Sequence, residues 1–144
     1  MTRKTYNVYD NRNRKTNSTE AWGTNLATTT VWHYDGANNI FKIDRPDGIS
    51  ETKGYDALNR MIRHTVPRQL PGYDPINLTT HIDYDPSGTI HQVTDSNNHH
   101  TSFLYDACDR KTRMTYHDNS YQSWTWDDAG NLASRTTVHG APET

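Results

Sequence analysis

"FLYDACDRKTRMTY" (residues 103–116) places a hydrophobic and aromatic run directly before a Tyr-Asp step, which is followed by a short polar gap and an arginine. Nearly the same pattern recurs in "KGYDALNRMIRHTV" (53–66), "IDYDPSGTIHQVTD" (82–95) and "WTWDDAGNLASRTT" (124–137). Self-similarity at a regular spacing is the sequence signature of a repeat architecture. The chain is therefore interpreted as an array of one recurring unit.

An aromatic residue followed by Asp marks six anchors, spaced by 25, 21, 29, 21 and 21 residues. They are Tyr9-Asp10, Tyr34-Asp35, Tyr55-Asp56, Tyr84-Asp85, Tyr105-Asp106 and Trp126-Asp127. The two longer spacings indicate irregular connections at 16–30 and 66–80. The second of these contains three prolines and predicts a long surface loop, in which Tyr73 is interpreted as a loop tyrosine outside the repeat.

The residue four positions after each anchor tyrosine or tryptophan is always Gly, Asn or Asp: Asn13, Asn38, Asn59, Gly88, Asp109 and Gly130. These residues tolerate a left-handed backbone at the lowest cost. The anchor Asp is of the type that accepts hydrogen bonds from backbone N–H groups two residues on. Each anchor therefore predicts a tight turn closed by a left-handed residue. Half a repeat later, Asp47-Gly48, Asn97-Asn98 and Asp118-Asn119 predict two-residue hairpin turns with positive φ.

One repeat is thus two strands and two turns, and the strands alternate. Trp32, Phe103 and Trp124 lie two residues before an anchor aromatic, which puts both rings on one face. Apolar residues follow at the sixth position (Ile40, Met61, Ile90, Leu132) and at the ninth (Ile43, Val93, Met114), with polar residues between them. We predict an all-β fold: one domain over 1–144, an antiparallel meander of about ten to twelve strands of ordinary length. Its six hairpin repeats would form a curved sheet or a partial shell or barrel.

Composition agrees with a thin sheet. Of the 144 residues 31% are hydrophobic, and the mean hydropathy is -1.05, which is too polar for a thick aliphatic core. Nine Tyr, four Trp and two Phe argue against disorder. A net charge of -2 without a basic stripe argues against nucleic-acid binding. The single Cys108 excludes an internal disulfide framework. No run is long enough for a membrane span, and "MTRKTYNVYD" has no signal-peptide core.

The segments "YDACDRKTRMTYHDNS", "YDALNRMIRHT" and "WDDAGNLASRT" resemble the YD-repeat, or Rhs-repeat, family. Arg14, Arg60 and Arg110 match the arginine that follows the turn glycine in that family's pattern. The chain departs from the pattern at Trp126, at the four anchor turns with Asn or Asp, and at the three repeats without the arginine. The resemblance implies hairpin strips that spiral into a hollow shell. In bacterial Rhs and insecticidal-type toxins such shells enclose a toxic polypeptide, and animal teneurin-like relatives belong to cell-surface adhesion proteins.

We therefore expect a structural module without enzymatic activity, a wall fragment of a secreted or cell-surface shell within a larger protein. Its partners would be neighbouring YD repeats or further copies of the chain. The alternative is an extracellular adhesion or carbohydrate-binding module, for which Trp32, Phe103 and Trp124 are the aromatics that would either contact a ligand or serve in packing. A remote alternative is a hydrolase, which would need a pocket that joins His91, His99 and His100.

The side chains with reactive chemistry form no recognisable motif. The eight histidines are His33, His64, His81, His91, His99, His100, His117 and His139, and none of their spacings matches a metal site. Nothing in the spacing joins Cys108 to His117 as a nucleophile and base would require. Asp85-Pro86 is interpreted as a turn with a proline, because it lies in phase with the other anchors. No cofactor or metal is expected.

Overall fold

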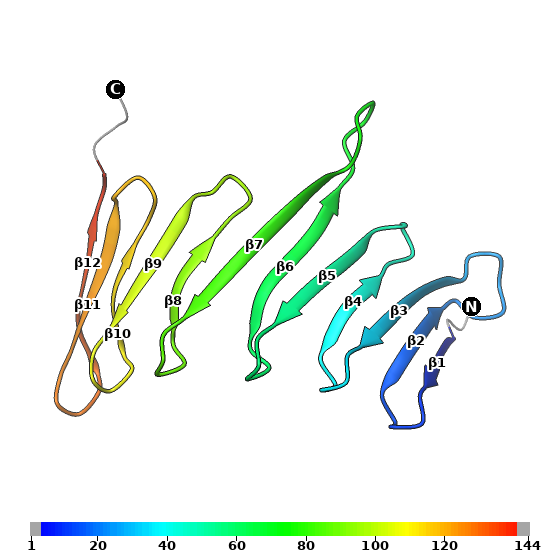
Figure 1. Ribbon diagram of the computed structural model, residues 1–144, viewed down its shortest axis with the longest axis horizontal. Helices are drawn as coiled ribbons and strands as arrows, with labels where there is room; N and C mark the ends of the chain where they lie inside the picture. Colours follow the sequence, from blue (N-terminus) through cyan, green and yellow to red (C-terminus); the bar gives the residue numbers. More distant parts are fainter. Residues whose placement is uncertain (1–3, 141–144) are drawn as a thin grey trace. The chain divides into compact units, whose positions relative to one another are not determined.

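The computed structural model describes residues 4–140, and within that range the chain forms strands and no helix. The strand order along the sheet is β1 to β12 in sequence order (Figure 1), so the predicted all-β antiparallel meander is confirmed with twelve strands. The strands are β1 (Thr5–Tyr9), β2 (Lys15–Glu20), β3 (Thr28–Tyr34), β4 (Ile40–Asp44), β5 (Ser50–Tyr55), β6 (Met61–Arg68), β7 (Ile76–Tyr84), β8 (Ile90–Thr94), β9 (His100–Tyr105), β10 (Lys111–Thr115), β11 (Tyr121–Trp126) and β12 (Leu132–Val138).

The strands group into two units that divide between Thr79 and Thr80, within β7. The first unit holds β1 to β6 and the start of β7, and the second holds the rest of β7 and β8 to β12. Within each unit the anchor turns lie along one edge of the strands, and the other turns lie along the opposite edge (Figure 1). That the whole chain forms one domain remains a prediction.

Strand register explains why apolar residues three positions apart share a face. Trp32 pairs with Ile43, and Tyr34 pairs with Ile40, because the register shifts between His33 and Tyr34. A shift of this kind is a β-bulge, in which one strand carries an extra residue. The same shift stands just before the anchor aromatic in all six hairpins. The bulge therefore places the sixth position opposite the anchor ring and the ninth opposite the residue two before it, so both lie on the face of that ring.

The anchor turns have the predicted backbone. At the fourth position φ is 60° for Asn13, 72° for Asn38, 61° for Asn59, 97° for Gly88, 57° for Asp109 and 85° for Gly130. In the first turn the N–H of Asn13 donates to the carbonyl of Asp10 at 3.0 Å, and the N–H of Asp10 donates to the carbonyl of Arg14 at 2.9 Å. Equivalent pairs of hydrogen bonds close the other five anchor turns.

The turns half a repeat later differ from the prediction of two-residue hairpins. Only the second member of each pair, Gly48, Asn98 or Asn119, has positive φ. The closing hydrogen bonds run from Gly48 N–H to the Arg45 carbonyl at 3.1 Å, and from Arg45 N–H to the Ile49 carbonyl at 2.8 Å. This is the geometry of the anchor turns. An Asx residue before the left-handed position is compatible with either turn, so composition alone did not separate them.

The two irregular connections are shorter than predicted. Strand β6 extends to Arg68 and β7 begins at Ile76, so most of the predicted 66–80 loop is a lengthened hairpin. The hydroxyls of Thr65 and Thr79 hydrogen-bond across it at 2.9 Å. The loop proper is 69–75, where Tyr73 is 75% exposed. Likewise only 21–27 of the 16–30 segment lies outside β2 and β3. The loops were predicted from the longer anchor spacings and, at 66–80, from three prolines, and these features do not show how far the flanking strands extend.

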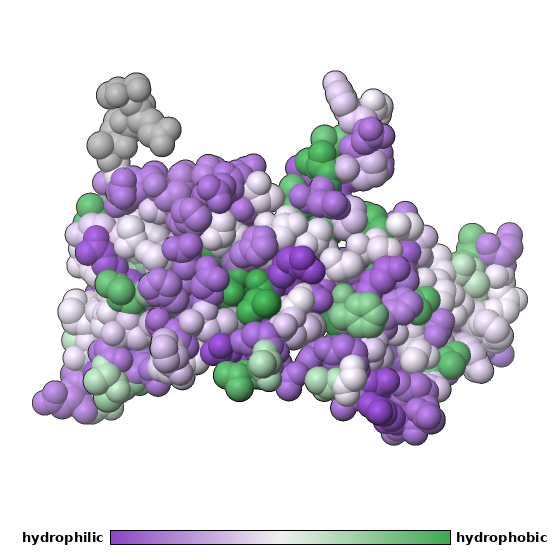
Figure 2. Space-filling view, in the orientation of Figure 1, coloured by the Kyte–Doolittle hydropathy of each residue, from purple (hydrophilic) through white to green (hydrophobic). Residues whose placement is uncertain are grey.

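The sheet has no closed hydrophobic core among the described residues. No hydrophobic side chain there is fully buried, and the two buried residues are Thr19 and Glu51, at 8% and 4% exposure. The visible surface is mainly hydrophilic, with hydrophobic residues in separate patches (Figure 2). Stability must therefore come largely from backbone ladders and from polar side-chain contacts between neighbouring strands.

Gly48→Ala should lower the free energy of unfolding by about 1 kcal/mol, because a left-handed backbone is unfavourable for a residue with a Cβ. Gly48 has a φ of +83°, and a Cβ there would meet no atom within 4 Å, so the cost is conformational only. Gly36 is the matched control, since its surroundings are equally open and its φ is not left-handed. Urea unfolding should show little change for Gly36→Ala, and equal losses for the two variants would contradict the explanation.

Candidate functional site

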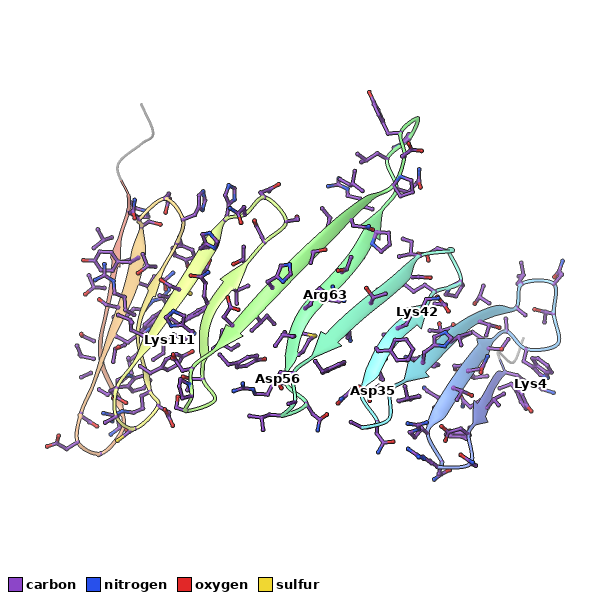
Figure 3. The ribbon with its side chains drawn as sticks, viewed as in Figure 1. Lys4, Asp35, Lys42, Asp56, Arg63 and Lys111 are labelled. Atoms are coloured by element: carbon purple, nitrogen blue, oxygen red, sulfur yellow. The ribbon has the colours of Figure 1, made fainter. Side chains whose placement is uncertain are left out.

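The anchor turns form a continuous polar feature along the edge of each unit, here called the turn ladder. Its first element is the anchor Asp, which accepts hydrogen bonds from the backbone of its own turn. Asp56 Oδ1 accepts from the N–H groups of Leu58 and Arg60, each at 2.9 Å. Figure 3 shows Asp35 and Asp56 at neighbouring turns on the same edge of the first unit. These bonds, led by the one from the Arg60 backbone, lower the pKa of Asp56 below its usual value of 3.8.

The second element is the side chain five positions after the anchor aromatic, here called the bridging residue. In the first, second and fifth repeats it bonds its own anchor Asp and extends to the next turn. Asn39 donates to Asp35 Oδ2 at 3.1 Å and to Asn59 Oδ1 at 2.8 Å. Arg110 donates to Asp106 Oδ2 at 2.7 Å and to the Asp127 carbonyl at 3.1 Å. Arg14, Asn39 and Arg110 therefore link one repeat to the next, and at Asn39 an asparagine stands in place of the family arginine.

The third element is the anchor ring. The hydroxyl of Tyr34 donates to the Lys15 carbonyl at 2.8 Å, and that of Tyr55 donates to the Ile40 carbonyl at 2.9 Å. Each acceptor lies six positions after the preceding anchor. Trp126 departs from the tyrosine pattern, yet its Nε1–H donates to the corresponding Lys111 carbonyl at 2.9 Å. The indole thus replaces the phenol without loss of the hydrogen bond.

The three aromatics proposed as ligand platforms have cations over their rings. Lys15 Nζ lies 4.5 Å from the centroid of Trp32, and Lys111 Nζ lies 4.6 Å from Phe103 and 5.9 Å from Trp124. A cation over an aromatic face is a favourable contact in itself. These rings are half-buried in strand-to-strand packing, and a planar ligand would have to displace the ammonium groups.

The histidines are distributed over separate contacts. His91 Nδ1 lies 3.6 Å from Asp85, whereas His100 Nδ1 is hydrogen-bonded with Thr94 Oγ1 at 2.9 Å. His99 stacks on His117 with centroids 3.9 Å apart. The trio required for a hydrolase is therefore not assembled. Within residues 4–140, no group of three or more His, Cys, Asp or Glu side chains is placed to hold a metal ion.

Cys108 and the remaining histidines are also separate from one another. Cys108 is exposed in the fifth anchor turn, where its N–H donates to Asp106 Oδ1 at 2.9 Å. His139 lies beyond the end of β12, and His81 pairs in register with Thr94.

Sequence reasoning missed an ionic cluster on the apolar face of the first unit. Glu51 pairs in register with Ile43, and its carboxylate bonds the guanidinium of Arg45 and lies 3.0 Å from His64 Nε2. Lys53, the neighbour of His64 across the ladder, stands where four of the other five repeats have an aromatic or aliphatic residue. The available signal was this interruption of the alternation by charged residues in the third repeat.

The stability of the first unit should decrease as the pH falls below 6.5. Burial, followed by the charges of Lys53 and Arg45, lowers the pKa of His64 below its usual 6.5. The unfolded chain then takes up the proton first, so stability is present above pH 6.5 and is lost as the pH falls toward the folded-state pKa. Urea unfolding at about pH 7.5 and about pH 5.5 measures this, and His64→Gln should reduce the difference. An unchanged difference in that variant would contradict the assignment.

The cavities are shallow and open. One of about 530 Å³ lies between the fourth and fifth anchor turns, and one of about 450 Å³ lies beside Trp32 and Arg45. The first is lined by Asp85, Ser87, Thr89, His91, Phe103, Leu104, Tyr105, Asp106, Ala107 and Asp109. In the first, the Ser87 hydroxyl is hydrogen-bonded with Thr89 Oγ1 at 3.1 Å, and His91 Nδ1 lies 3.6 Å from Asp85.

Comparison with known proteins shows that the chain is similar to short parts of several toxin proteins. No family model matches the chain. Over 95 residues, which are 63% of the chain, it is 28% identical to double-stranded DNA deaminase toxin A of Burkholderia cenocepacia (strain H111). The match spans 7% of that protein.

Solved structures share the fold over most of the chain. Crystal structures of TcdB2-TccC3, alone and with Cdc42, superpose with a TM-score of 0.75 over 90% of the chain, at 13% identity. A Photorhabdus luminescens Tc holotoxin pore gives 0.72 over 87%, also at 13% identity. The fold is of the YD-repeat type. The chain spans about 7% of the length of each of these relatives.

Proposed function

We propose that the chain is a structural wall segment of a larger, secreted or cell-surface YD-repeat shell that encloses or presents a toxin. The observation that carries the proposal is the turn ladder, in which Asn39 and Arg110 bond their own turn and the next one. These side chains extend from one repeat to the next, so they stabilise the contact between repeats. The shared fold with segments of toxin-complex structures supports the same interpretation.

An immunoblot of the source cells and their medium, with antibody against this chain, tests the proposal. A wall segment should appear in a band far above 16.6 kDa and should be found in the medium or at the cell surface. A sole band near 16.6 kDa would overturn the proposal, because a wall segment belongs to a larger protein.

No helix in residues 4–140 is both long and apolar enough to cross a membrane.

We further propose that the isolated chain associates with copies of itself through its terminal strands. All residues of β1 and β12 are exposed, and an exposed strand edge can pair with another chain. Between repeats the register is constant: Asn17 pairs with Val31, Lys42 with Thr52, Gln92 with Ser102 and Arg113 with Ser123. Each pair joins the residue eight after one anchor to the residue three before the next. Continued across two copies, the rule pairs Ser134 with Tyr6.

Cysteine crosslinking tests that register. In a Cys108→Ser background, chains with Ser134→Cys and chains with Tyr6→Cys should form a mixed disulfide under oxidation. The matched control replaces Ser134→Cys with Val138→Cys, which lies out of register and should crosslink far less. A strictly monomeric chain at high concentration, or equal crosslinking in both mixtures, would overturn the proposal.

A carbohydrate-binding role is the second candidate, and one exposed aromatic pair favours it. Tyr6 and Trp22 stack with centroids 4.7 Å apart, and they are 48% and 51% exposed. Unlike the three predicted platforms, this pair presents uncovered ring surface of the kind that sugars stack on. Tryptophan fluorescence should change on glycan titration and should fail to change in Trp22→Ala. No change in the wild-type chain would remove this candidate.

We propose that the chain has no deaminase activity of its own despite its resemblance to a deaminase toxin. Zinc deaminases hold the metal with at least two cysteines and use a separate glutamate as general acid and base. This chain has one cysteine, fewer than such a zinc site requires. Incubation with double-stranded DNA should yield no uracil or hypoxanthine, and formation of either product by the purified chain would contradict the proposal.

A further inference from the structure

Arg14 shows how a guanidinium group is held between consecutive anchor turns. Its Nε donates to Asp10 Oδ2 at 2.7 Å, and its NH1 donates to Asn38 Oδ1 at 2.8 Å and toward the Asp35 carbonyl at 3.4 Å. Its Cζ lies 4.5 Å from the centroid of the Tyr34 ring. The site therefore consists of an anchor carboxylate, the next anchor ring, and two oxygen acceptors from the next turn.

The fourth repeat has no side chain that can fill this place. Its bridging residue is Thr89, whose Oγ1 is hydrogen-bonded with Ser87 Oγ at 3.1 Å and with its own Asp85 Oδ2 at 3.4 Å. Threonine ends at Cγ, so it cannot extend to the fifth anchor turn. The cavity of about 530 Å³ lies there, between Asp85 and Asp109.

Every group that contacts Arg14 has an equivalent in this cavity. Asp85 corresponds to Asp10, and Tyr105 corresponds to Tyr34. Asp109 stands in place of Asn38, so a neutral amide acceptor is replaced by a carboxylate. The Asp109 side chain makes no hydrogen bond to any of residues 4–140, whereas the Asp106 carboxylate is occupied by Arg110. The gap therefore has the acceptors of the Arg14 site and more negative charge.

We propose that this gap binds the guanidinium group of an arginine side chain from a partner polypeptide. A planar guanidinium can bond Asp85 and Asp109 together and stack on the Tyr105 ring, whereas an ammonium group has neither the fork nor the plane. His91 lines the cavity with its Nδ1 3.6 Å from Asp85 Oδ1, so an incoming guanidinium shares that carboxylate with the imidazole. The inference goes beyond the wall role and does not depend on it.

Methylguanidinium and methylammonium provide a matched pair of probes with the same charge. Titration at millimolar concentration, far below denaturing levels, should shift the amide NMR signals of Tyr105 and Asp109 in a saturable way with methylguanidinium. Methylammonium should bind more weakly. Asp109→Asn should weaken methylguanidinium binding by about two- to fivefold, the range for loss of an exposed ion pair. Thr89→Arg should abolish binding, because its own guanidinium then occupies the gap.

Equal shifts in wild type and Thr89→Arg, non-saturating shifts, or equal binding of the two probes would overturn the proposal. Signal dispersion reports whether Thr89→Arg folds. If it does not, the Asp109→Asn variant and the comparison of probes still decide the question.

Discussion

Glu51→Ala should lower the free energy of unfolding by about 2 kcal/mol, the size expected when hydrogen bonds to a buried charged group are lost. Glu51 is 4% exposed and bonds both Arg45 and His64. Breaking a fully buried pair costs more, but Arg45 is 52% exposed and returns to water when its partner is removed. Chemical denaturation at neutral pH measures the loss.

Glu51→Gln is the matched control, because it keeps the volume and one acceptor oxygen while it removes the charge. Its loss should lie between those of wild type and Glu51→Ala. A Glu51→Ala chain as stable as wild type would mean that desolvation of the carboxylate offsets its contacts, and the cluster would then add nothing to stability.

Asp56→Ala should lower the melting temperature by on the order of 5 °C, because one side chain satisfies three donors of a single turn. Its carboxylate accepts from Leu58 N–H and Arg60 N–H at 2.9 Å and from Arg60 Nε at 2.7 Å. Without it two turn N–H groups lose their acceptor and the bridging guanidinium loses its anchor. Thermal unfolding followed by circular dichroism provides the measurement.

Asp128→Ala is the control, since no hydrogen bond involves the Asp128 side chain within residues 4–140; its melting temperature should stay near that of wild type. The Asp56 contribution also has a pH signature. Its pKa is lowered on folding, so the contribution is present above pH 3.8 and is lost as the pH falls below that value. If Asp56→Ala and wild type still differ equally in stronger acid, the effect does not come from the carboxylate.

Much of the fold could be predicted because the turns and strands of each repeat depend on residue types that are close together in the sequence. Asn13, Asn59 and Asp109 were recognisable as left-handed positions, since few residue types adopt that backbone at low cost. Alternation before and after each anchor predicted the strands and their shared face. The apparent break in period between Ile40 and Ile43 is accounted for by a bulge, which is a pairing feature and leaves no local composition signal.

The candidate sites were less predictable, because they depend on residues from different repeats. The contact between Asn39 and Asn59 joins residues 20 positions apart, and the Lys111 carbonyl accepts from Trp126 15 positions on. Sequence marks such residues individually but does not show which of them meet. The same holds for Glu51, whose exposure of 4% could not be inferred from a charged residue in a polar strand.

The sequence by itself determined the unit and its turns, because backbone preference at each anchor acts within five residues. The tertiary structure decided the contacts between repeats. It determined which aromatic rings are covered by lysine, which bridging residues reach the next turn, and that Thr89 does not reach it. Those outcomes depend on side-chain length and on the register between strands. Both act across about 21 residues of chain, well beyond the range of local preference.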